Sequence, residues 1–260
     1  QKTAYEIKEC DWSSDVCSSD LGGLQRGVDP GEAGEVHRFG PGGGVDRTAR
    51  LLQKVLQDRR LLDVAAAVVN RTGGGVLAQG YLSQHAGDAH YLEVSATSLL
   101  TNHLTGRTPH QYTDFTPLAI LFNEPTVFAV HAKSGAKSAR DLLERLRREP
   151  YVPSFAIGSA LGSATHVAAA LVVKAAGGDV RKMKAVVLNS SGDSVTQVLG
   201  GHIDVVISPA TLVLPHAHAG NLRMIAVASP RRVKGALSEV PSWRELGVDA
   251  VSLNWRGIIG

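Results

Sequence analysis

The sequence predicts an α/β protein with two sheets, and three observations lead to this prediction. Short apolar segments alternate with segments of helical periodicity from about residue 36 to residue 228. The apolar segments are continuous runs, as in parallel strands that helices cover on both faces. The length of 260 residues suits one or two domains, and 43% hydrophobic with 20% charged residues is typical of a globular chain. Two sheets fit these segments better than one.

Residues 1–21 do not take part in this prediction. They show neither apolar periodicity nor the apolar central stretch of a signal peptide. The run Asp11–Leu21 resembles a translated sequencing adapter, so we expect residues 1–21 to be adapter-derived and not native. A natural disordered leader is the alternative. Both cysteines, Cys10 and Cys17, lie in this segment, so the rest of the chain predicts neither a disulfide framework nor a cysteine-based metal site.

The charge and composition of the remaining chain exclude several classes of protein. Without residues 1–21, which hold two Lys and five acidic residues, the formal net charge rises from +3 to +6. Lys and Arg are spread along the chain and aromatic residues make up only 5%, so no nucleic-acid-binding surface is expected. The longest uncharged apolar run, Val167–Val173, is too short to span a bilayer.

Helical periodicity and helix-stop signals define the predicted helices, and apolar runs define the strands. Ser138, with Asp141 three residues later, marks one helix start, and Gly177 marks the end of another helix. The predicted helices are Val45–Arg59, Val76–Gln84, Ser138–Arg148, Ser163–Ala176, Asp193–Leu199 and Thr211–Ala219. The predicted strands are Asp63–Asn70, Tyr91–Thr97, Leu118–Phe122, Val127–His131, Ser154–Gly158, Lys184–Leu188, Ile203–Ser208 and Leu222–Ala228.

Three turns rich in glycine and serine come just before predicted helices and are the candidate ligand loops. They are Gly40–Asp46, Gly158–His166 and Asn189–Ser194, with a shorter turn at Thr97–Ser98. Backbone N–H groups at a helix start attract anions, and glycines let a ligand approach the backbone closely. The alternative for each turn is a plain tight turn or an N-cap, and for a glycine run alone the plain turn is the favoured interpretation. Three of them at the carboxyl ends of parallel strands indicate a shared site for an anion.

The same turns lack the residues that nucleotide sites and hydrolases need. The first turn has neither a Gly-Lys-Ser/Thr sequence nor the Gly-x-Gly-x-x-Gly spacing, and Ser159 is not in a Gly-x-Ser-x-Gly elbow. His216 and His218 have no carboxylate nearby in the sequence, which favours an exposed helix end over a metal site. His166 is expected to hydrogen-bond or to line the cleft and not to act as a base. We therefore expect no catalytic residue, no metal and no cofactor.

The motifs from Phe39 onward resemble those of the substrate-binding receptors of tripartite tricarboxylate transporters, also called Bug-type receptors. The resemblance covers about residues 36–260. It is carried by Phe39–Arg50, Val68–Arg71, Gly73–Gly75, Leu99–Gly106, Asp114–Ala119, Gly158–His166, Asn189–Gly192, Leu199–Asp204, Leu214–His216 and Asn254–Gly257.

This resemblance implies a two-lobed α/β fold of the type II periplasmic-binding-protein kind, with the ligand cleft between the lobes. Residues 22–123 with 225–260 are expected to form lobe 1, and residues 124–224 lobe 2, with chain crossings at Phe122–His131 and Leu222–Ala228. The family has an apolar strand before the glycine loop, for which Gly31–Arg38 is too polar. We therefore expect a degraded N-terminal strand, and also a missing C-terminal part because the family continues beyond Gly260.

The resemblance also implies the ligand-binding residues, position by position. The first glycine loop is expected to hold one ligand carboxylate, and the loop before the helix at Ser163 the other. Asp46 is expected to orient its loop and not to contact the anion directly. The expected binding residues are Pro41, Gly42, Gly43, Gly44, Asp46, Thr97, Ser98, Ser159, Gly162, Ser163, Thr165, Ser191 and Ser208.

The function implied by the resemblance is that of a periplasmic receptor, although no signal peptide is present in this stretch of chain. Such a receptor binds a small di- or tricarboxylate and delivers it to a large and a small integral membrane subunit. A monomer without nucleic-acid partners is expected, and citrate, other carboxylates, aromatic acids and amino acids remain open as ligands. Two alternatives are an enzyme of similar fold, which needs a base beside a nucleophile, and the sensing domain of a transcription regulator.

Overall fold

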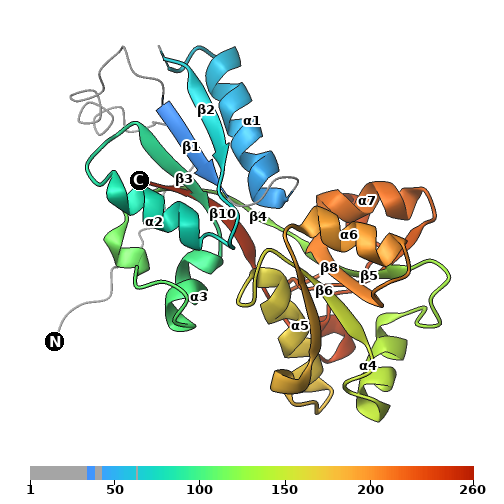
Figure 1. Cartoon of the computed structure of the whole chain (residues 1–260). Helices are drawn as coiled ribbons and strands as arrows, with labels where there is room; N and C mark the ends of the chain where they lie inside the picture. The colour runs from blue at the N-terminus through green and yellow to red at the C-terminus, as the bar shows by residue number, and fades with distance from the viewer. Residues whose placement is uncertain (1–33, 39–42, 63) are drawn as a thin grey trace.

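The computed structural model describes residues 34–38, 43–62 and 64–260, so the expected adapter segment, residues 1–21, lies outside the described residues. Two five-stranded sheets lie side by side, each with its own set of helices (Figure 1). We call each sheet with its helices a lobe. The helices are α1 (Gly44–Asp58), α2 (Val76–Gln84) and α3 (Ser98–Leu104) in the first lobe, then α4 (Ala139–Arg148), α5 (Ala164–Ala175), α6 (Ser191–Leu199) and α7 (Ala210–His218) in the second.

The first sheet has the strand order β2-β1-β3-β10-β4. The strand β1 pairs in parallel with β2 and β3, whereas β10 is antiparallel to both of its neighbours. The strands are β1 (Gly34–Arg38), β2 (Ala66–Asn70), β3 (Tyr91–Ser95), β4 (Pro117–Glu124) and β10 (Asn254–Ile259).

The expectation that Gly31–Arg38 is too polar for a central strand is wrong for its last five residues. Gly34–Arg38 forms β1, with β2 on one side and β3 on the other. A sheet is held by backbone hydrogen bonds that any residue except proline can make, and strand propensity is a weaker influence than pairing on both sides. The polar composition of this segment therefore did not prevent it from forming a strand.

The second sheet repeats the plan of the first, with the order β7-β6-β8-β5-β9. Here β6 pairs in parallel with β7 and β8, and β5 is antiparallel to β8 and β9. The strands are β5 (Thr126–His131), β6 (Ser154–Gly158), β7 (Lys184–Leu188), β8 (Val205–Pro209) and β9 (Leu222–Val227). In both sheets one strand runs antiparallel between three parallel strands and an edge strand.

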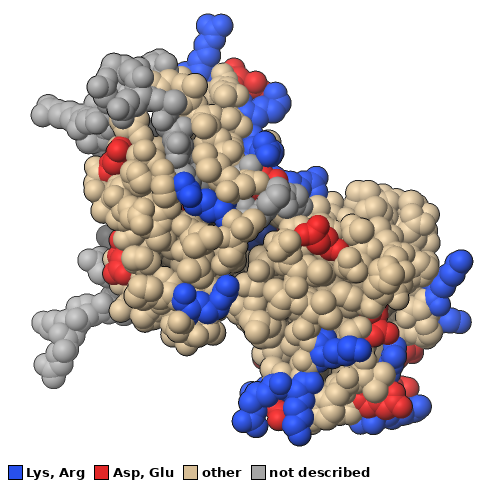
Figure 2. Space-filling model, viewed as in Figure 1, with Lys and Arg blue, Asp and Glu red and all other residues tan. Residues whose placement is uncertain are grey.

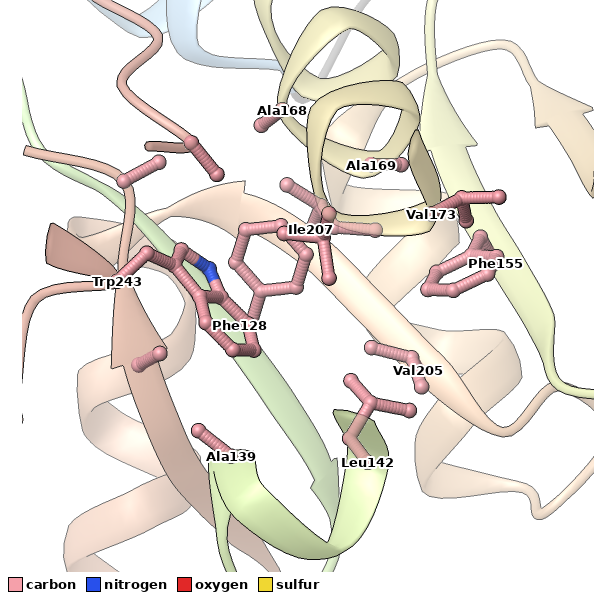
Figure 3. Close-up of a cluster of buried hydrophobic side chains, with 14 of the residues drawn as sticks. Phe128, Ala139, Leu142, Phe155, Ala168, Ala169, Val173, Val205, Ile207 and Trp243 are labelled. Carbon is pink, nitrogen blue, oxygen red and sulfur yellow. The ribbon is translucent and has the colours of Figure 1, made fainter. Parts of the chain in front are cut away.

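Helices on both faces of the second sheet explain why its strands are continuous apolar runs. Successive side chains of a strand point to opposite faces, and β5 shows this: Phe128 packs in one buried cluster and Val127 in another. The first cluster includes residues of α4 and α5, and the second includes residues of α6 and α7. Trp243 lies edge-on to Phe128 with 5.1 Å between ring centroids (Figure 3).

The chain crosses between the lobes at two places. The first crossing is at Pro125, between β4 of the first sheet and β5 of the second. The expected lobe boundary at residue 225 falls inside β9, which belongs to the second sheet, and Trp243 is buried in the second lobe. We therefore propose that lobe 2 extends to about residue 253 and that the return to lobe 1 begins with β10.

Most predicted elements are present with ends that differ by a few residues, and a few elements were not predicted. Three segments, Val76–Gln84, Ser154–Gly158 and Lys184–Leu188, have the predicted bounds. The helix α3 and the strand β10 were missed. None of the helices in the described residues is long and apolar enough to cross a membrane.

Candidate functional site

A cavity lies where the two lobes meet, and its wall is built from helix starts. Among the described residues, the starts of α1 and α3 from lobe 1 and of α5 and α6 from lobe 2 reach it. Each of these helices follows a strand, so their N-termini gather at the carboxyl ends of the parallel strands of the two sheets. The described residues of the wall are Gly43, Gly44, Val45, Ala96, Thr97, Ser98, Gly158, Ser159, Ser163, Ala164, Thr165, Asn189, Ser190, Ser191, Asn254 and Arg256.

The helix starts give this cavity a positive electrostatic character. The first N–H groups of a helix have no partner within the helix, and the helix dipole adds partial positive charge at the same end. α1, α5 and α6 have 15, 12 and 9 residues, so each is long enough for a developed dipole. Opposed N-termini from two lobes can therefore hold an anion with a negative group at each end.

On the lobe 1 side, the backbone at the start of α1 lies very close to Arg256. A Cβ added at Gly44 would lie 2.6 Å from the Arg256 Nη2 atom and 3.1 Å from the Glu124 Oε2 atom. Only glycine fits there without displacing buried groups. Asp46 lies two residues later; its carboxylate accepts a hydrogen bond from the Arg50 Nε atom at 3.1 Å, and it is not on the wall.

On the lobe 2 side, the loop before α5 is held by its own hydrogen bonds. The Ser163 hydroxyl caps α5 by accepting from the His166 backbone N–H, and it lies 3.0 Å from the Thr165 hydroxyl. The Gly162 backbone N–H donates to the His166 Nδ1 atom at 3.1 Å. Because the Nδ1 atom accepts this hydrogen bond, it carries no proton and the imidazole is neutral. Burial lowers the pKa of His166, which also favours the neutral form. His166 thus shapes the loop.

Two backbone features tighten the lobe 2 side further. Ser159 adopts a φ of +72°, a left-handed conformation that is uncommon for a residue other than glycine. A Cβ added at Gly158 would lie 2.7 Å from the Ser191 backbone nitrogen, so β6 and the start of α6 touch at this point. Ser190 caps α6 by accepting from the Asp193 N–H at 3.1 Å. The loops before α5 and α6 are therefore closely packed against each other.

Arg256 is a charged wall residue that the sequence analysis did not identify. It reaches the wall from β10, and its side chain is 4% exposed. Its Nη1 atom donates to Asn254 Oδ1 at 2.6 Å, and its Nη2 atom donates to Glu124 Oε2 at 3.1 Å. The Nε atom is buried without a hydrogen-bond partner. Burial lowers the pKa of Arg256 and the Glu124 carboxylate opposes this, so the guanidinium stays charged at neutral pH.

Direct hydrogen bonds cross between the lobes around the cavity. The Thr101 hydroxyl of α3 donates to the Gly162 carbonyl at 2.8 Å, and the Thr211 hydroxyl of α7 donates to the Glu124 Oε1 atom of β4 at 2.6 Å. The lobes are therefore in contact at the rim of the cavity. The cavity volume is about 50 Å³, which is room for about three to five waters at roughly 10–15 Å³ each. A small ligand fits this arrangement.

Eight of the predicted site residues lie together on the wall, and others lie beside it. Asp46 and Gly162 adjoin the wall in sequence, and Ser208 is fully buried at the end of β8 and is not part of the wall. Pro41 and Gly42 lie outside the described residues. Those on the wall are Gly43, Gly44, Thr97, Ser98, Ser159, Ser163, Thr165 and Ser191.

The wall residues that were not predicted include Asn189, Ser190, Asn254 and Arg256. Asn189 and Ser190 lie in the turn Asn189–Ser194, which the sequence analysis identified as a candidate ligand loop. The predicted residue Ser191 in the same turn therefore indicated their position. Asn254 and Arg256 stand in the quoted motif Asn254–Gly257, but nothing local in the sequence places that motif at the cavity. Their position follows from the insertion of β10 between β3 and β4.

The outer surface of the protein carries charges of both signs. On the face drawn in Figure 2, Lys and Arg side chains are interspersed with Asp and Glu side chains over both lobes. No group of three or more His, Cys, Asp or Glu residues that could hold a metal ion was found within the described part of the chain.

Comparisons with known proteins agree with this architecture. The chain is 30% identical over 214 residues to BugT of Bordetella pertussis, a match that covers 80% of this chain and 64% of BugT. It is 26% identical over 221 residues to a UPF0065 protein of Bordetella bronchiseptica, with coverage of 83% and 63%. The chain thus spans slightly less than two thirds of the length of these curated relatives.

Solved structures share the same fold. One described as a periplasmic transporter is 26% identical, with a TM-score of 0.80 over 90% of this chain and 78% of that one. MatC from Rhodopseudomonas palustris, solved with bound malate, is 20% identical, with a TM-score of 0.78 over 88% and 78%. These similarities confirm the predicted two-lobed periplasmic-binding-protein fold.

The family assignment rests on a match over most of the chain. The model of the tripartite tricarboxylate transporter family receptor matches residues 49–260. This match includes the starts of α3, α5 and α6 and the whole of β10, which together form most of the cavity wall. The resemblance seen in the sequence is confirmed, and the chain belongs to the tripartite tricarboxylate transporter receptor family.

Proposed function

We propose that this protein is a solute receptor that binds a small carboxylate between its lobes. The observation that carries the proposal is the meeting of helix starts from both lobes at one cavity, with serine and threonine hydroxyls between them. Exposed donors of this kind stabilise an anion by about 0.3–1 kcal/mol each, and by up to about 2 kcal/mol when partly buried. Several such donors together are enough for a dissociation constant near the micromolar range.

The opposed arrangement of the donors favours a ligand with a carboxylate at each end. α1 and α3 would hold one end, with Gly43, Gly44, Thr97 and Ser98. α5 and α6 would hold the other. Two proteins of this fold from Rhodopseudomonas palustris were solved with malate and with adipate, which are both dicarboxylates. We therefore place small dicarboxylates first among the ligands to test.

The family to which the chain belongs supports the rest of the proposed role. Family members are periplasmic solute-binding receptors, so we propose that the whole protein acts in the periplasm and as a monomer. Delivery of the ligand would need contact with the large and small membrane subunits of a tripartite transporter. Release would follow from opening of the lobes, which breaks the hydrogen bonds across the rim.

An enzyme is the weaker alternative. A base must lie within hydrogen-bond reach of a nucleophile, and the Nδ1 atom of His166 is already used by the Gly162 N–H. None of the described wall residues is Asp, Glu, His or Lys. We propose that the protein performs no chemistry on its ligand.

Thermal unfolding with a panel of carboxylates tests the proposal. Ligand at 100 times its dissociation constant should raise the free energy of unfolding by about 2.7 kcal/mol, and neutral amides of the same length should not. Gly43→Asp and Ser163→Asp should abolish the shift by placing negative charge at a helix start. Ser238→Asp, on an exposed residue away from the wall, is the matched control. A folded protein without a shift for any carboxylate would refute the proposal.

A further inference from the structure

The wall of the cavity has an unusual charge balance. Among the described residues that line it, Arg256 is the one charged side chain, and every other lining residue is glycine, apolar, or a neutral Ser, Thr or Asn. None of these described lining residues presents a carboxylate to the ligand. A ligand with an ammonium group would therefore meet a guanidinium and helix N-termini, and it would find only hydroxyl and amide oxygens to accept its hydrogen bonds.

The guanidinium has a counter-ion that lies behind the wall. Glu124, with a side chain that is 8% exposed, holds the Arg256 Nη2 atom at 3.1 Å, and it is not on the wall itself. Its other carboxylate oxygen accepts from the Thr211 hydroxyl of α7 at 2.6 Å. Both oxygens of Glu124 are thus engaged away from the cavity, and the carboxylate cannot serve as the partner of a ligand ammonium group.

We infer that Arg256 determines the specificity of the cavity for dianionic carboxylates that lack an ammonium group, and that Glu124 weakens their binding by competing for the guanidinium. This inference rests on the proposed function. The start of α1 lies beside the guanidinium, since a Cβ added at Gly44 would lie 2.6 Å from the Arg256 Nη2 atom, so we place the contact between a ligand carboxylate and Arg256 on the lobe 1 side. Charge-assisted hydrogen bonds to a guanidinium are stronger than neutral ones.

The two members of the ion pair should give opposite effects when they are neutralised. Glu124→Gln leaves the shape and removes the competing charge, so a dicarboxylate should bind several-fold more tightly. Arg256→Gln removes the charge that attracts the ligand, so the same dicarboxylate should bind about 10- to 150-fold more weakly. If the two residues had a purely structural role, the two substitutions would not change the ligand affinity in opposite directions.

The experiment is isothermal titration calorimetry on the whole chain with three ligands of one length. Succinate carries two carboxylates, succinamate replaces one with an amide, and L-aspartate adds an ammonium group. We expect wild type to bind in the order succinate, succinamate, aspartate. In the double variant Glu124→Gln with Arg256→Gln, succinate should lose its advantage over succinamate.

The double variant also protects the test from a folding artefact. Arg256→Gln alone leaves the Glu124 carboxylate buried without its partner, which is destabilising, whereas the double variant keeps the pair neutral. Circular dichroism would confirm that each variant is folded. The inference is refuted if succinate affinity is the same in wild type, Glu124→Gln and the double variant, or if wild type prefers aspartate. If wild type binds none of the three ligands or any other carboxylate, the proposed function fails and this inference fails with it.

Discussion

The carboxyl group of Glu93 predicts an unusual dependence of stability on pH. Glu93 lies in β3 near the middle of the first sheet and is 0% exposed. Neither of its carboxyl oxygens has a hydrogen-bond partner among the described residues. Burial raises the pKa of Glu93 to about 8. The folded protein therefore keeps this side chain protonated and neutral up to mildly basic pH.

The sign of the effect follows from the proton that the folded state retains. The ordinary pKa of 4.5 applies to the unfolded chain, so between pH 4.5 and 8 the folded state binds more protons than the unfolded state. The contribution of the Glu93 carboxyl to the free energy of unfolding is complete below pH 4.5 and is lost as the pH rises through 8. At about 1.4 kcal/mol per pH unit, roughly 3 kcal/mol is lost between pH 5 and pH 7.5.

Urea unfolding of wild type and Glu93→Gln at pH 5.0, 6.5 and 7.5 checks this reasoning. Glutamine has nearly the same shape and does not ionise, so the variant should gain about 3 kcal/mol relative to wild type over this range. Glu144→Gln is the control, because Glu144 is exposed on α4 and forms only a long surface pair with Arg148 at 3.9 Å. A difference between wild type and Glu93→Gln that stays constant with pH would refute the argument.

Three further predictions concern packing and the contact between the lobes. Gly158→Ala should destabilise the protein by about 1–3 kcal/mol and weaken ligand binding, because its Cβ would lie 2.7 Å from the Ser191 backbone nitrogen. Gly80→Ala, inside α2 with nothing within 4 Å of the new Cβ, should instead stabilise it by about 0.5–1 kcal/mol. Urea unfolding measures both changes in stability. A Gly158→Ala variant that is more stable than Gly80→Ala would contradict these two predictions. Thr101→Val removes the hydrogen bond to Gly162 across the rim. In calorimetry, this variant should have a ligand dissociation constant about 2- to 12-fold higher than that of wild type. An unchanged dissociation constant would show that this hydrogen bond does not favour the bound state.

The sequence was most informative where function depends on local structure. A strand that ends in a Gly- or Ser-rich turn and continues as a helix places backbone N–H groups at the carboxyl edge of a sheet, whatever the rest of the chain does. The predicted wall residues Gly43, Ser98, Ser163 and Ser191 all belong to such units. Ser208 was expected only because the family resemblance places a cleft-lining residue there, and its side chain is fully buried and not part of the wall.

The sequence was least informative where position depends on pairing between distant strands. β10 contributes Asn254 and Arg256 to the wall because it lies between β3 and β4, which are more than 120 residues earlier. No local pattern reveals that order. β1 shows the opposite error, since the side chains of Gly34–Arg38 argued against a strand that backbone pairing forms on both sides.

The position of the Arg256–Glu124 pair connects ligand charge to lobe movement. Glu124 is the last residue of β4 and directly precedes Pro125, where the chain crosses into lobe 2. Its second carboxylate oxygen is held by Thr211, which belongs to lobe 2. A rotation of the lobes about this crossing would change the contact between Thr211 and Glu124. Without the Thr211 hydrogen bond, the Glu124 carboxylate would interact more strongly with Arg256. The guanidinium would then attract the ligand carboxylate less strongly. Opening would then weaken the hold on the ligand by electrostatics as well as by separating the helix starts, so one crossing point would serve both closure and release.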